Sequence, residues 1–239
     1  MASSSRNTPQ SAFLSQIVRV HTDTVPNQTA LDFSKYRKIT KETIRVDEEP
    51  FWILQSLAKS CEIVRVWSDK LSALCRIASA DRERAFFANV LDLVVLRMAL
   101  RMQDNIERIV LCNALVFHKS QIAYVLTSNI LQQIQELANK LKQPDQAVSA
   151  LLVSLTFLQD ANSSQTTSTS SELYGKLREI LKEYCQQVQG GNLYAQLSEL
   201  MMQVRQIALQ LKQRLKQCNV YNSSVYPMCI PANSFLDQV

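Results

Sequence analysis

The chain has 239 residues, of which 46% are hydrophobic and 20% are charged, an ordinary composition for a globular protein with a full core. Its 3 glycines and 6 prolines are too few for the many tight turns of an all-β sandwich or barrel. The net charge of +5 is mild and its basic residues are mostly scattered, which argues against direct nucleic-acid binding by this chain. We therefore expect a mostly helical protein.

The first half of the chain carries three predicted helices. Ser11–His21 has a short amphipathic pattern, and a longer helix begins at Pro50, a residue tolerated in a first turn. The third helix spans Ser79–Met102, with Ser79 as its expected N-terminal cap. Because residues 90–100 are apolar on nearly every side, this helix is predicted to be buried at the centre of a helical bundle.

The second half begins with a small two-stranded element. Arg108–His118 is rich in β-branched residues and has a possible turn at Cys112-Asn113. Three further helices are predicted to begin at Ser128, Pro144 and Ser171. The polar tract 161–171 has no apolar group to bury and is expected to be a flexible loop within a single domain. Gly190-Gly191 is expected to interrupt the chain before the last long helix.

The last long helix, Asn192–Cys218, places apolar residues at alternating steps of four and three, as in a coiled-coil seam. This pattern fits either the core of the domain or an interface with a partner. The candidate dimer seam consists of Met201, Val204, Ala208, Leu211 and Leu215.

The residues give no sign of catalytic or metal chemistry. The six cysteines form no C-x-x-C pair, so we expect buried free thiols in a reducing compartment. His21 and His118 lack a metal-ligand spacing, and the three glycines cannot build a phosphate loop. The chain also shows neither a signal peptide nor an apolar run of membrane-spanning length. We expect a soluble intracellular protein that is not an enzyme and holds no cofactor.

Four stretches of the sequence resemble the ligand-binding domain of nuclear receptors, most closely the orphan Nur group. They are SQIVRVHTDTVPNQTALDFSKYRKI at Ser15–Ile39, CEIVRVWSDKL at Cys61–Leu71, ADRERAFFANVLDLVVLRMALR at Ala80–Arg101, and LCNALVFHKSQ at Leu111–Gln121. The first and third together are specific, because the first is typical of the Nur group rather than of nuclear receptors generally.

This resemblance implies an all-α, three-layer helical sandwich with a small two-stranded β element, formed by residues 1–239 as one domain. It also implies a nuclear location, a role in transcription by RNA polymerase II, and contacts with transcriptional coregulators. The implied dimer is a homodimer, or a pair with a retinoid X receptor-like partner. Zinc and DNA contacts would belong to a DNA-binding domain that is absent from this chain.

The sequence departs from the family pattern at positions that fill the core. Val90 and Val94 stand where the family has phenylalanine, and Leu111 stands where another aromatic residue is usual. Unless neighbours such as Phe86, Phe87, Met98 or Met102 collapse inward, smaller side chains leave a void. The candidate pocket lining consists of Leu57, Cys61, Val64, Val90, Val94 and Leu111.

The coactivator groove implied by the family also departs from its pattern. Asp69 occupies the position where most nuclear receptors have a lysine, and Arg84 replaces an apolar residue of the groove. The expected final helix, residues 230–239, is weak because Pro231 and Asn233 have poor helix propensity. The candidate coregulator groove consists of Asp69, Lys70, Arg82, Arg84, Phe235, Leu236 and Asp237. Binding of standard LxxLL peptides is therefore not expected.

Three hypotheses follow. The first is the regulatory domain of a Nur-type orphan receptor that acts largely without a ligand through protein contacts and dimerisation. The second is a ligand-gated sensor whose small apolar ligand occupies the space beside Val90 and Val94. The third is a helical scaffold with no role in transcription.

Overall fold

The computed structural model describes residues 9–37, 48–102, 107–141, 144–159, 168–188 and 192–222. In this part the chain forms eight α-helices, one short 3-10 helix and one two-stranded sheet. The elements are α1 (Pro9–Thr22), η1 (Gln28–Ala30), α2 (Glu49–Cys75), α3 (Ser79–Arg101), β1 (Arg108–Val110), β2 (Val116–His118), α4 (Lys119–Leu126), α5 (Ser128–Leu141), α6 (Gln146–Phe157), α7 (Ser168–Val188) and α8 (Asn192–Asn222). The predicted fold class is confirmed.

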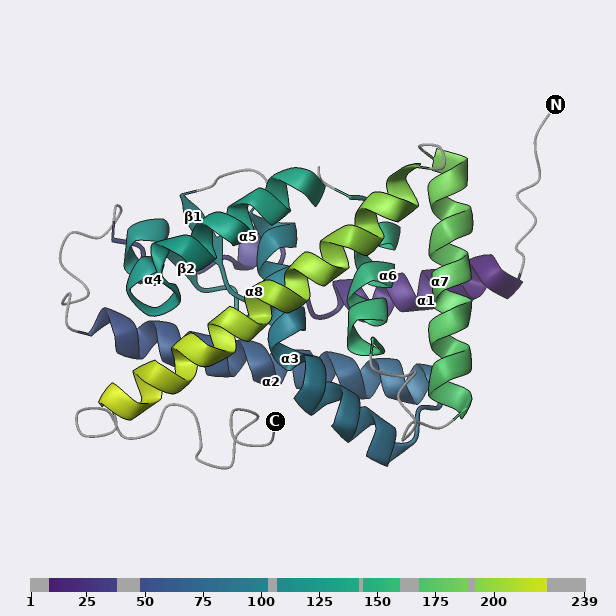
Figure 1. Ribbon diagram of the computed structural model, residues 1–239, viewed down its shortest axis with the longest axis horizontal. Coiled ribbons are helices and arrows are strands. Elements are labelled where there is room, and N and C mark those ends of the chain that lie inside the picture. The colour runs from purple at the N-terminus through teal and green to yellow at the C-terminus, as the bar shows by residue number, and fades with distance from the viewer. Residues whose placement is uncertain are drawn as a thin grey trace.

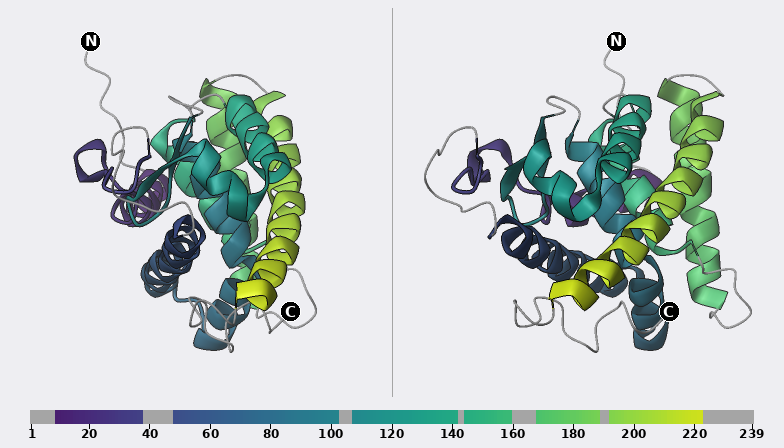
Figure 2. Two further views of the ribbon diagram at one scale, coloured as in Figure 1. Left: turned by 90° about the vertical axis from the view of Figure 1, so that its left-hand side faces the viewer. Right: turned by 60° about the vertical axis from the view of Figure 1, so that its left-hand side comes forward.

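The helices are arranged in three layers. The side view in Figure 2 shows α1 and α2 on one side of the molecule and α7 and α8 on the other, with α3 between them. Figure 1 shows α8 running diagonally across the front of the domain, with α7 beside its N-terminal end. Helix α3 packs against α2, α5, α6 and α8, so it contacts both outer layers. The three-layer helical sandwich is the architecture expected from the sequence.

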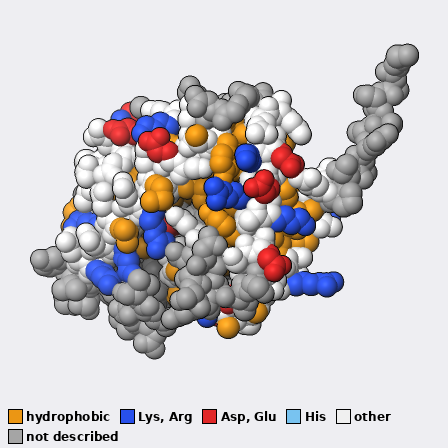
Figure 3. All heavy atoms as spheres, turned by 45° about the vertical axis from the view of Figure 1, so that its right-hand side comes forward, with side chains coloured by type: hydrophobic (Ala, Val, Ile, Leu, Met, Phe, Trp, Pro, Cys, Tyr) orange, Lys and Arg blue, Asp and Glu red, His pale blue; other side chains and the backbone are white. Residues whose placement is uncertain are grey.

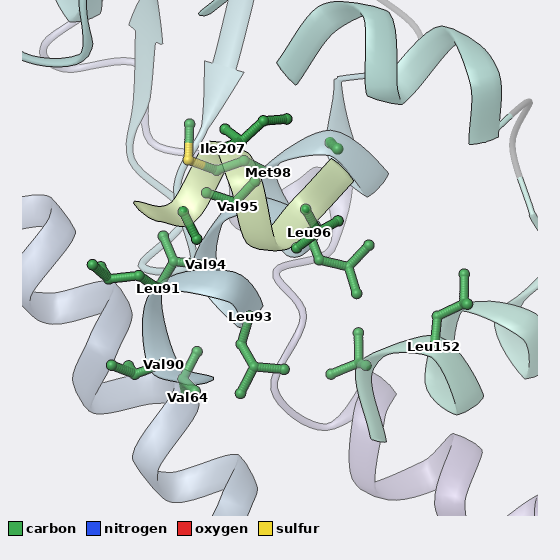
Figure 4. Packing of buried hydrophobic residues seen from close by; sticks show 14 of the residues in the cluster. Val64, Val90, Leu91, Leu93, Val94, Val95, Leu96, Met98, Leu152 and Ile207 are labelled. Atoms are coloured by element: carbon green, nitrogen blue, oxygen red, sulfur yellow. The ribbon is translucent and has the colours of Figure 1, made fainter. Parts of the chain in front are cut away.

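Helix α3 is the central element, as predicted. From Asn89 to Ala99 every residue is buried, including Asp92 and Arg97. Figure 4 shows apolar side chains of α3 among those of α2, α6 and α8, with Val64, Leu152 and Ile207 contributed by these neighbours. A helix that is apolar on every side needs partners on every side, and the surrounding layers supply them.

Several helix caps differ from the sequence-based expectation. Ser79 does not cap α3, because the N-cap residue is Ala78 and Ser79 already lies within the helix. Similarly, Ser128 is the first residue of α5, and it is Thr127 whose Oγ1 accepts from the amide of Ile130 at 3.4 Å. Helix α6 is capped by Asp145, whose Oδ1 accepts from Val148 N at 2.9 Å. Each of these side-chain caps satisfies an otherwise free amide.

The predicted two-stranded element is an antiparallel hairpin. Its register pairs Arg108 with His118 and Val110 with Val116, and the turn falls at Cys112-Asn113 as expected. Tyr36, Val110 and Val116 form a second small apolar cluster. The passage that follows α1 therefore covers the hairpin from outside, and Asp32 forms an isolated bridge with Leu115.

Helix α4 was not predicted from the sequence. It follows β2 directly, and His118 caps it: the His118 Nδ1 accepts from Ser120 N at 3.3 Å, while Gln121 Oε1 accepts from His118 N at 2.9 Å. A histidine in the place of the usual Ser, Thr, Asp or Asn cap, followed by only 8 helical residues, gives a weak start signal in a sequence.

The later boundaries also differ. Helix α7 begins at Ser168, so the end of the tract predicted as a loop is helical, and α8 continues past Cys218 to Asn222. Most of that tract, the Gly190-Gly191 interruption and the weak helix predicted at 230–239 lie outside the described residues.

The described residues carry five free cysteines, of which four are buried and Cys75 is partly exposed. No helix among them combines the length and apolarity needed to cross a bilayer. Within the same ranges no cluster of three or more His, Cys, Asp or Glu residues could hold a metal ion. On the face shown in Figure 3, basic and acidic side chains are distributed among apolar ones.

Candidate ligand pocket and partner surfaces

The six residues predicted to line a pocket lie together in the apolar core. Leu57, Cys61 and Val64 come from α2, Val90 and Val94 from α3, and Leu111 directly follows β1. All six are buried in one cluster. Val90 also borders a small cavity of about 40 Å³ between α3 and α8. The structure therefore brings the predicted lining together, but of the six residues only Val90 borders this cavity.

The neighbours proposed to fill the space behave in two ways. Met98 and Met102 are fully buried. Phe86 and Phe87 instead pack edge to face with each other, with a ring-centre distance of 5.5 Å. The guanidinium carbon of Arg65 lies 3.7 Å from the centre of the Phe86 ring, an arrangement that favours a cation–π attraction. Phe86 is therefore buried against Arg65, while Phe87 also borders the cavity beside Val90.

Polar contacts connect α2 with the hairpin behind this lining. The amide of Cys112 donates to Ser60 Oγ at 3.1 Å, and Ser60 Oγ itself donates to Ser56 O at 2.8 Å. Burial raises the pKa of the Cys61 thiol, and the neighbouring Cys112 raises it further. Cys61 is therefore a neutral thiol that contributes to the core as a small apolar group.

The predicted coregulator groove contains a cluster of ion pairs. Arg82 Nη1 lies 3.3 Å from Asp69 Oδ1, and its Nη2 lies 2.9 Å from Glu83 Oε1. Arg65 Nη1 lies 2.6 Å from the same Glu83 oxygen. The hydrogen bond from Arg65 is the largest cause of a lowered pKa of Glu83. Asp69 and Arg82 are therefore brought together, and sequence reasoning missed Arg65 and Glu83.

Two other predicted groove residues, Lys70 and Arg84, pair with carboxylates outside that cluster. Lys70 Nζ lies 3.2 Å from Asp23 Oδ2, just past the end of α1, and Arg84 Nη1 lies 3.4 Å from Asp81. Phe235, Leu236 and Asp237 lie outside the described residues. Among the large apolar side chains near the described part of this surface, Val66 is 50% exposed.

The predicted dimer seam is packed against the chain's own core. Val204, Ala208, Leu211 and Leu215 are buried, and Met201 is partly buried against the same cluster. The physical reason is that α8 lies across α3 and α5, so this face of the helix already has partners. Among the described side chains of α8, the exposed large apolar ones are Met202, at 58%, and Leu209, at 51%. They lie seven residues apart on one face, which is about 100° around the helix from the seam.

Polar contacts fix α8 on the domain. Arg205 Nη1 lies 2.6 Å from Asn89 Oδ1 and 3.1 Å from Asp92 Oδ2, both buried on α3. The side-chain amides of Gln133 and Gln210 exchange hydrogen bonds of 2.9 and 3.2 Å between α5 and α8. These contacts hold the Met202 and Leu209 face outward, and no coiled-coil pattern indicates them in the sequence.

No family model matches the chain. It is 28% identical to nuclear receptor subfamily 4 group A member 1 from Homo sapiens over 185 residues, covering 74% of this chain. It is 25% identical to the member 1 receptor of Xenopus laevis over 178 residues, or 72% of this chain. The member 2 receptor of Xenopus tropicalis is 24% identical over 236 residues, or 95% of this chain.

The chain spans about 30% of the length of the member 1 receptors and 39% of the member 2 receptor that it matches. These relatives are nuclear receptors, a family of transcription factors rather than enzymes. The matches and the three-layer helical fold agree with the resemblance found in the four sequence stretches. The chain is therefore a homologue of the Nur-group nuclear receptors and carries a helical domain of their ligand-binding type.

Proposed function

We propose that this chain is the regulatory domain of a Nur-type receptor that controls transcription by RNA polymerase II in the nucleus, largely without a ligand. The observation that carries the proposal is the similarity to the member 1 receptor. The match covers 74% of this chain but only 30% of the receptor's length. In the proposal, DNA is bound by a zinc-based domain outside this chain. The chain itself supplies protein contacts and dimerisation.

Ligand independence is supported by the packing of the core. The predicted pocket lining is buried, and the cavity beside Val90 has a volume of about 40 Å³. Pockets that hold drug-sized ligands typically have volumes of about 300–1,000 Å³. A space of this size beside Val90 accommodates a few carbon atoms and not an apolar hormone.

The coregulator surface of the proposal is charged. Asp69 and Arg82 pair with each other, and Arg65 and Glu83 extend the cluster across the junction of α2 and α3. Exposed ion pairs contribute little to stability, so their charges remain available to steer a partner. We propose that the coregulator contacts this surface with charged side chains beside an apolar anchor on Val66.

Dimerisation is assigned to the outward face of α8. Met202 and Leu209 are exposed large apolar residues on that face. A second copy of the chain, or a retinoid X receptor-like partner, would cover them without disturbing the buried line from Val204 to Leu215. The proposed interface thus lies on a different face of the helix from the seam predicted by the sequence.

A reporter assay tests the regulatory function. The 239-residue chain is fused to a heterologous DNA-binding domain, and transcription of a reporter gene is measured in cells grown in lipid-stripped medium. The proposal expects activation or repression of the reporter relative to the DNA-binding domain alone. A charge-reversing Arg82→Glu variant should weaken the effect, while Lys59→Glu, at an exposed site elsewhere on α2, should not. A fusion with no effect on the reporter in several cell types would contradict the regulatory function.

The sensor hypothesis is a second candidate, favoured by the free space beside Val90. Native mass spectrometry of the purified chain, compared with its mass after denaturation, separates the two. A retained small-molecule mass supports the sensor. A protein without added mass that still regulates the reporter supports the ligand-independent domain.

A further inference from the structure

The passage that follows η1 crosses the outside of the hairpin as residues 32–37, which we call the strap. Asp32 N donates to Ala114 O at 3.0 Å, and Val116 N donates to Asp32 O at 2.9 Å. These two bonds make an isolated parallel bridge between Asp32 and Leu115. Strands of globular proteins usually run for about 3–10 residues. The strap is therefore fixed to the sheet at one residue rather than along an edge.

The apolar anchor of the strap is separate from the main core of the domain. Tyr36 is 5% exposed and forms a small cluster with Val110 and Val116 of the hairpin. The side chains that surround α3 belong to a different and much larger cluster. A segment that shares few contacts with the core can open while the rest of a protein stays folded. We therefore expect the strap to leave the hairpin without opening the core around α3.

A buried glutamine of α4 holds the backbone of the strap. Gln121 is 0% exposed, and its Nε2 donates to Lys35 O at 2.9 Å. Its Oε1 accepts from Arg37 N at 3.2 Å, so the two contacts lie on either side of Tyr36. One side-chain amide thus donates to and accepts from the main chain. Because these contacts involve no side chain of the strap, another peptide of the same backbone shape could make them.

A buried carboxylate holds the side chain that follows Tyr36. The Glu49 side chain, at the start of α2, is 4% exposed, and its Oε1 accepts from Arg37 Nε at 2.8 Å. Its Oε2 forms an ion pair with Arg37 Nη2, and Gln121 Nε2 donates to its Oε1 at 3.1 Å. A carboxylate taken out of water is costly unless a cation compensates for it. A segment that occupies this place must therefore present a cation to Glu49.

The strap carries a second basic residue before Tyr36. Lys35 Nζ lies 4.1 Å from the centre of the Trp52 ring on α2, an arrangement that favours a cation–π attraction. Lys35 and Trp52 also border an open groove of about 720 Å³ between the strap and α2. The strap is therefore not enclosed on the side of α2.

The contacts of the strap are those of a bound peptide, since separate groups hold its backbone, its aromatic ring and its two cations. We call these groups the seat, and they are Glu49, Trp52, Val110, Val116 and Gln121. We propose that the strap is an autoinhibitory segment, which occupies the seat until a partner peptide takes its place with a basic residue, an aromatic residue and an arginine in succession. The proposal is independent of the regulatory function proposed above, because it rests only on the contacts of the strap.

Amide hydrogen exchange followed by NMR tests whether the strap opens alone. The amides of Arg37 and Val116 donate across the contact, so they exchange when the strap lifts. Both should exchange faster than the amides in the middle of α3. Glu49→Gln removes the charge but keeps the shape, and it should speed this exchange by about tenfold or more relative to α3. Lys59→Gln, at an exposed site of α2 outside the seat, should not.

A peptide supplied in trans tests the seat. The probe is a fluorescein-labelled peptide of the sequence LDFSKYR, whose anisotropy is measured as purified chain is added. Arg37→Ser weakens the strap at a side chain that is 43% exposed, and its far-UV circular dichroism should match that of the parent. Tyr36→Ser serves as a second released variant.

The released variants should bind the peptide saturably at submillimolar concentration. The parent should bind it about tenfold more weakly or less, because its own strap competes at a high effective concentration. Adding Glu49→Gln to Arg37→Ser should weaken binding again. A control peptide with serine in place of its tyrosine and arginine should not bind.

Three results would overturn the proposal. The first is exchange of the Arg37 and Val116 amides at the rate of the α3 amides, since the strap would then open only when the domain unfolds. The second is equal affinity of the peptide for the parent and the released variants, or for the control peptide and the probe. The third is an absence of saturation in both released variants up to ~1 mM chain, because the seat would then accept no peptide.

Discussion

Arg101 donates from Nη2 to Cys112 Sγ across 3.3 Å, while its Nε donates to Val110 O at 3.0 Å. One side chain thus ties the end of α3 to the hairpin. Burial alone raises the pKa of the Cys112 thiol, but the positive charges of Arg101 and Arg97 oppose this and bring the pKa below its usual value. Cys61, equally buried, has a raised pKa because of its burial. Two neighbouring thiols of the core therefore respond to pH in opposite directions.

The first prediction compares these thiols between pH 7.5 and 9.5. A thiol whose pKa is higher in the folded than in the unfolded chain makes stability fall as pH rises. A thiol whose pKa is lower in the folded chain makes stability increase as pH rises. Cys112→Ala should therefore make stability fall more steeply with rising pH than in the parent, and Cys61→Ala less steeply. Urea unfolding midpoints under reducing conditions measure both. Parallel pH profiles for the two variants would show that Arg101 does not act on Cys112 as described.

The second prediction concerns His21, whose pKa is lowered to about 3 by burial first and then by the charges of Arg97 and Arg101. In the unfolded chain this group titrates near 6.5. Between these values the unfolded state binds more protons, so stability present above pH 6.5 is lost as pH falls toward 3. The loss should approach about 1.4 kcal/mol per pH unit below pH 6.

In His21→Gln the free energy of unfolding should depend less on pH between pH 6.5 and 5. Carboxylates of ordinary pKa contribute little to the pH dependence in this range. His118→Gln is the matched control, since His118 is the other histidine of the chain and should leave the slope from His21 in place. An unchanged slope in His21→Gln would mean that His21 is not the buried neutral group described here.

The sequence was sufficient to predict the central helix and the layer architecture. Hydrophobic periodicity and the run of apolar residues on every side of α3 are local properties, so they can be recognised in a sequence. The order of the layers was predicted from the resemblance to nuclear receptors. Periodicity did not distinguish an apolar helix face that packs in the core of the domain from one that forms a dimer interface. Val204 and Leu211 lie on a seam pattern in the sequence, and only the packing of α8 on α3 and α5 shows that this line faces inward.

Two other features depend on contacts between distant segments. The start of α4 relies on a His118 ring and a Gln121 side chain that fold back onto the same turn, which no propensity indicates. A cavity beside Arg97 needs His21 from α1 and Ser149 from α6 on either side of α3. In the sequence Arg97 is an isolated charge in an apolar run, and its contacts with Thr24 and Trp67 become visible only in three dimensions.

The third prediction concerns the outward face of α8. If a dimer forms there, Leu209→Glu should shift sedimentation or light scattering from dimer to monomer. Its stability as a monomer should change by no more than about 0.5 kcal/mol, because Leu209 is half exposed. Leu211→Glu should instead unfold the chain, since Leu211 is fully buried.

Val66→Glu is the control for the effect of a new surface charge, because Val66 is equally exposed but lies on α2. It should leave the dimer intact. A dimer that persists in Leu209→Glu and in Met202→Glu would exclude this face, and dissociation caused equally by Val66→Glu would indicate a non-specific effect of charge.

The fourth prediction tests the phenylalanine-to-valine departures of α3. Val90 borders the cavity of about 40 Å³, so Val90→Phe places part of its ring in free space and should change stability by less than about 1 kcal/mol. Val94 is fully buried, and the cavity beside Val90 does not extend to it. Val94→Phe should therefore overpack the core and cost about 1–3 kcal/mol.

Thermal unfolding and the reporter fusion together test whether the cavity beside Val90 binds a ligand. In a ligand-independent domain, Val90→Phe should preserve both the melting temperature and the transcriptional effect, because nothing needs to enter the cavity that the ring fills. In a ligand-gated sensor the same variant should keep its stability and lose its response, since the ring would occupy the ligand's place. A Val90→Phe chain that is as destabilised as Val94→Phe would instead show that α3 and α8 pack without usable space at Val90, which removes the structural support for the sensor.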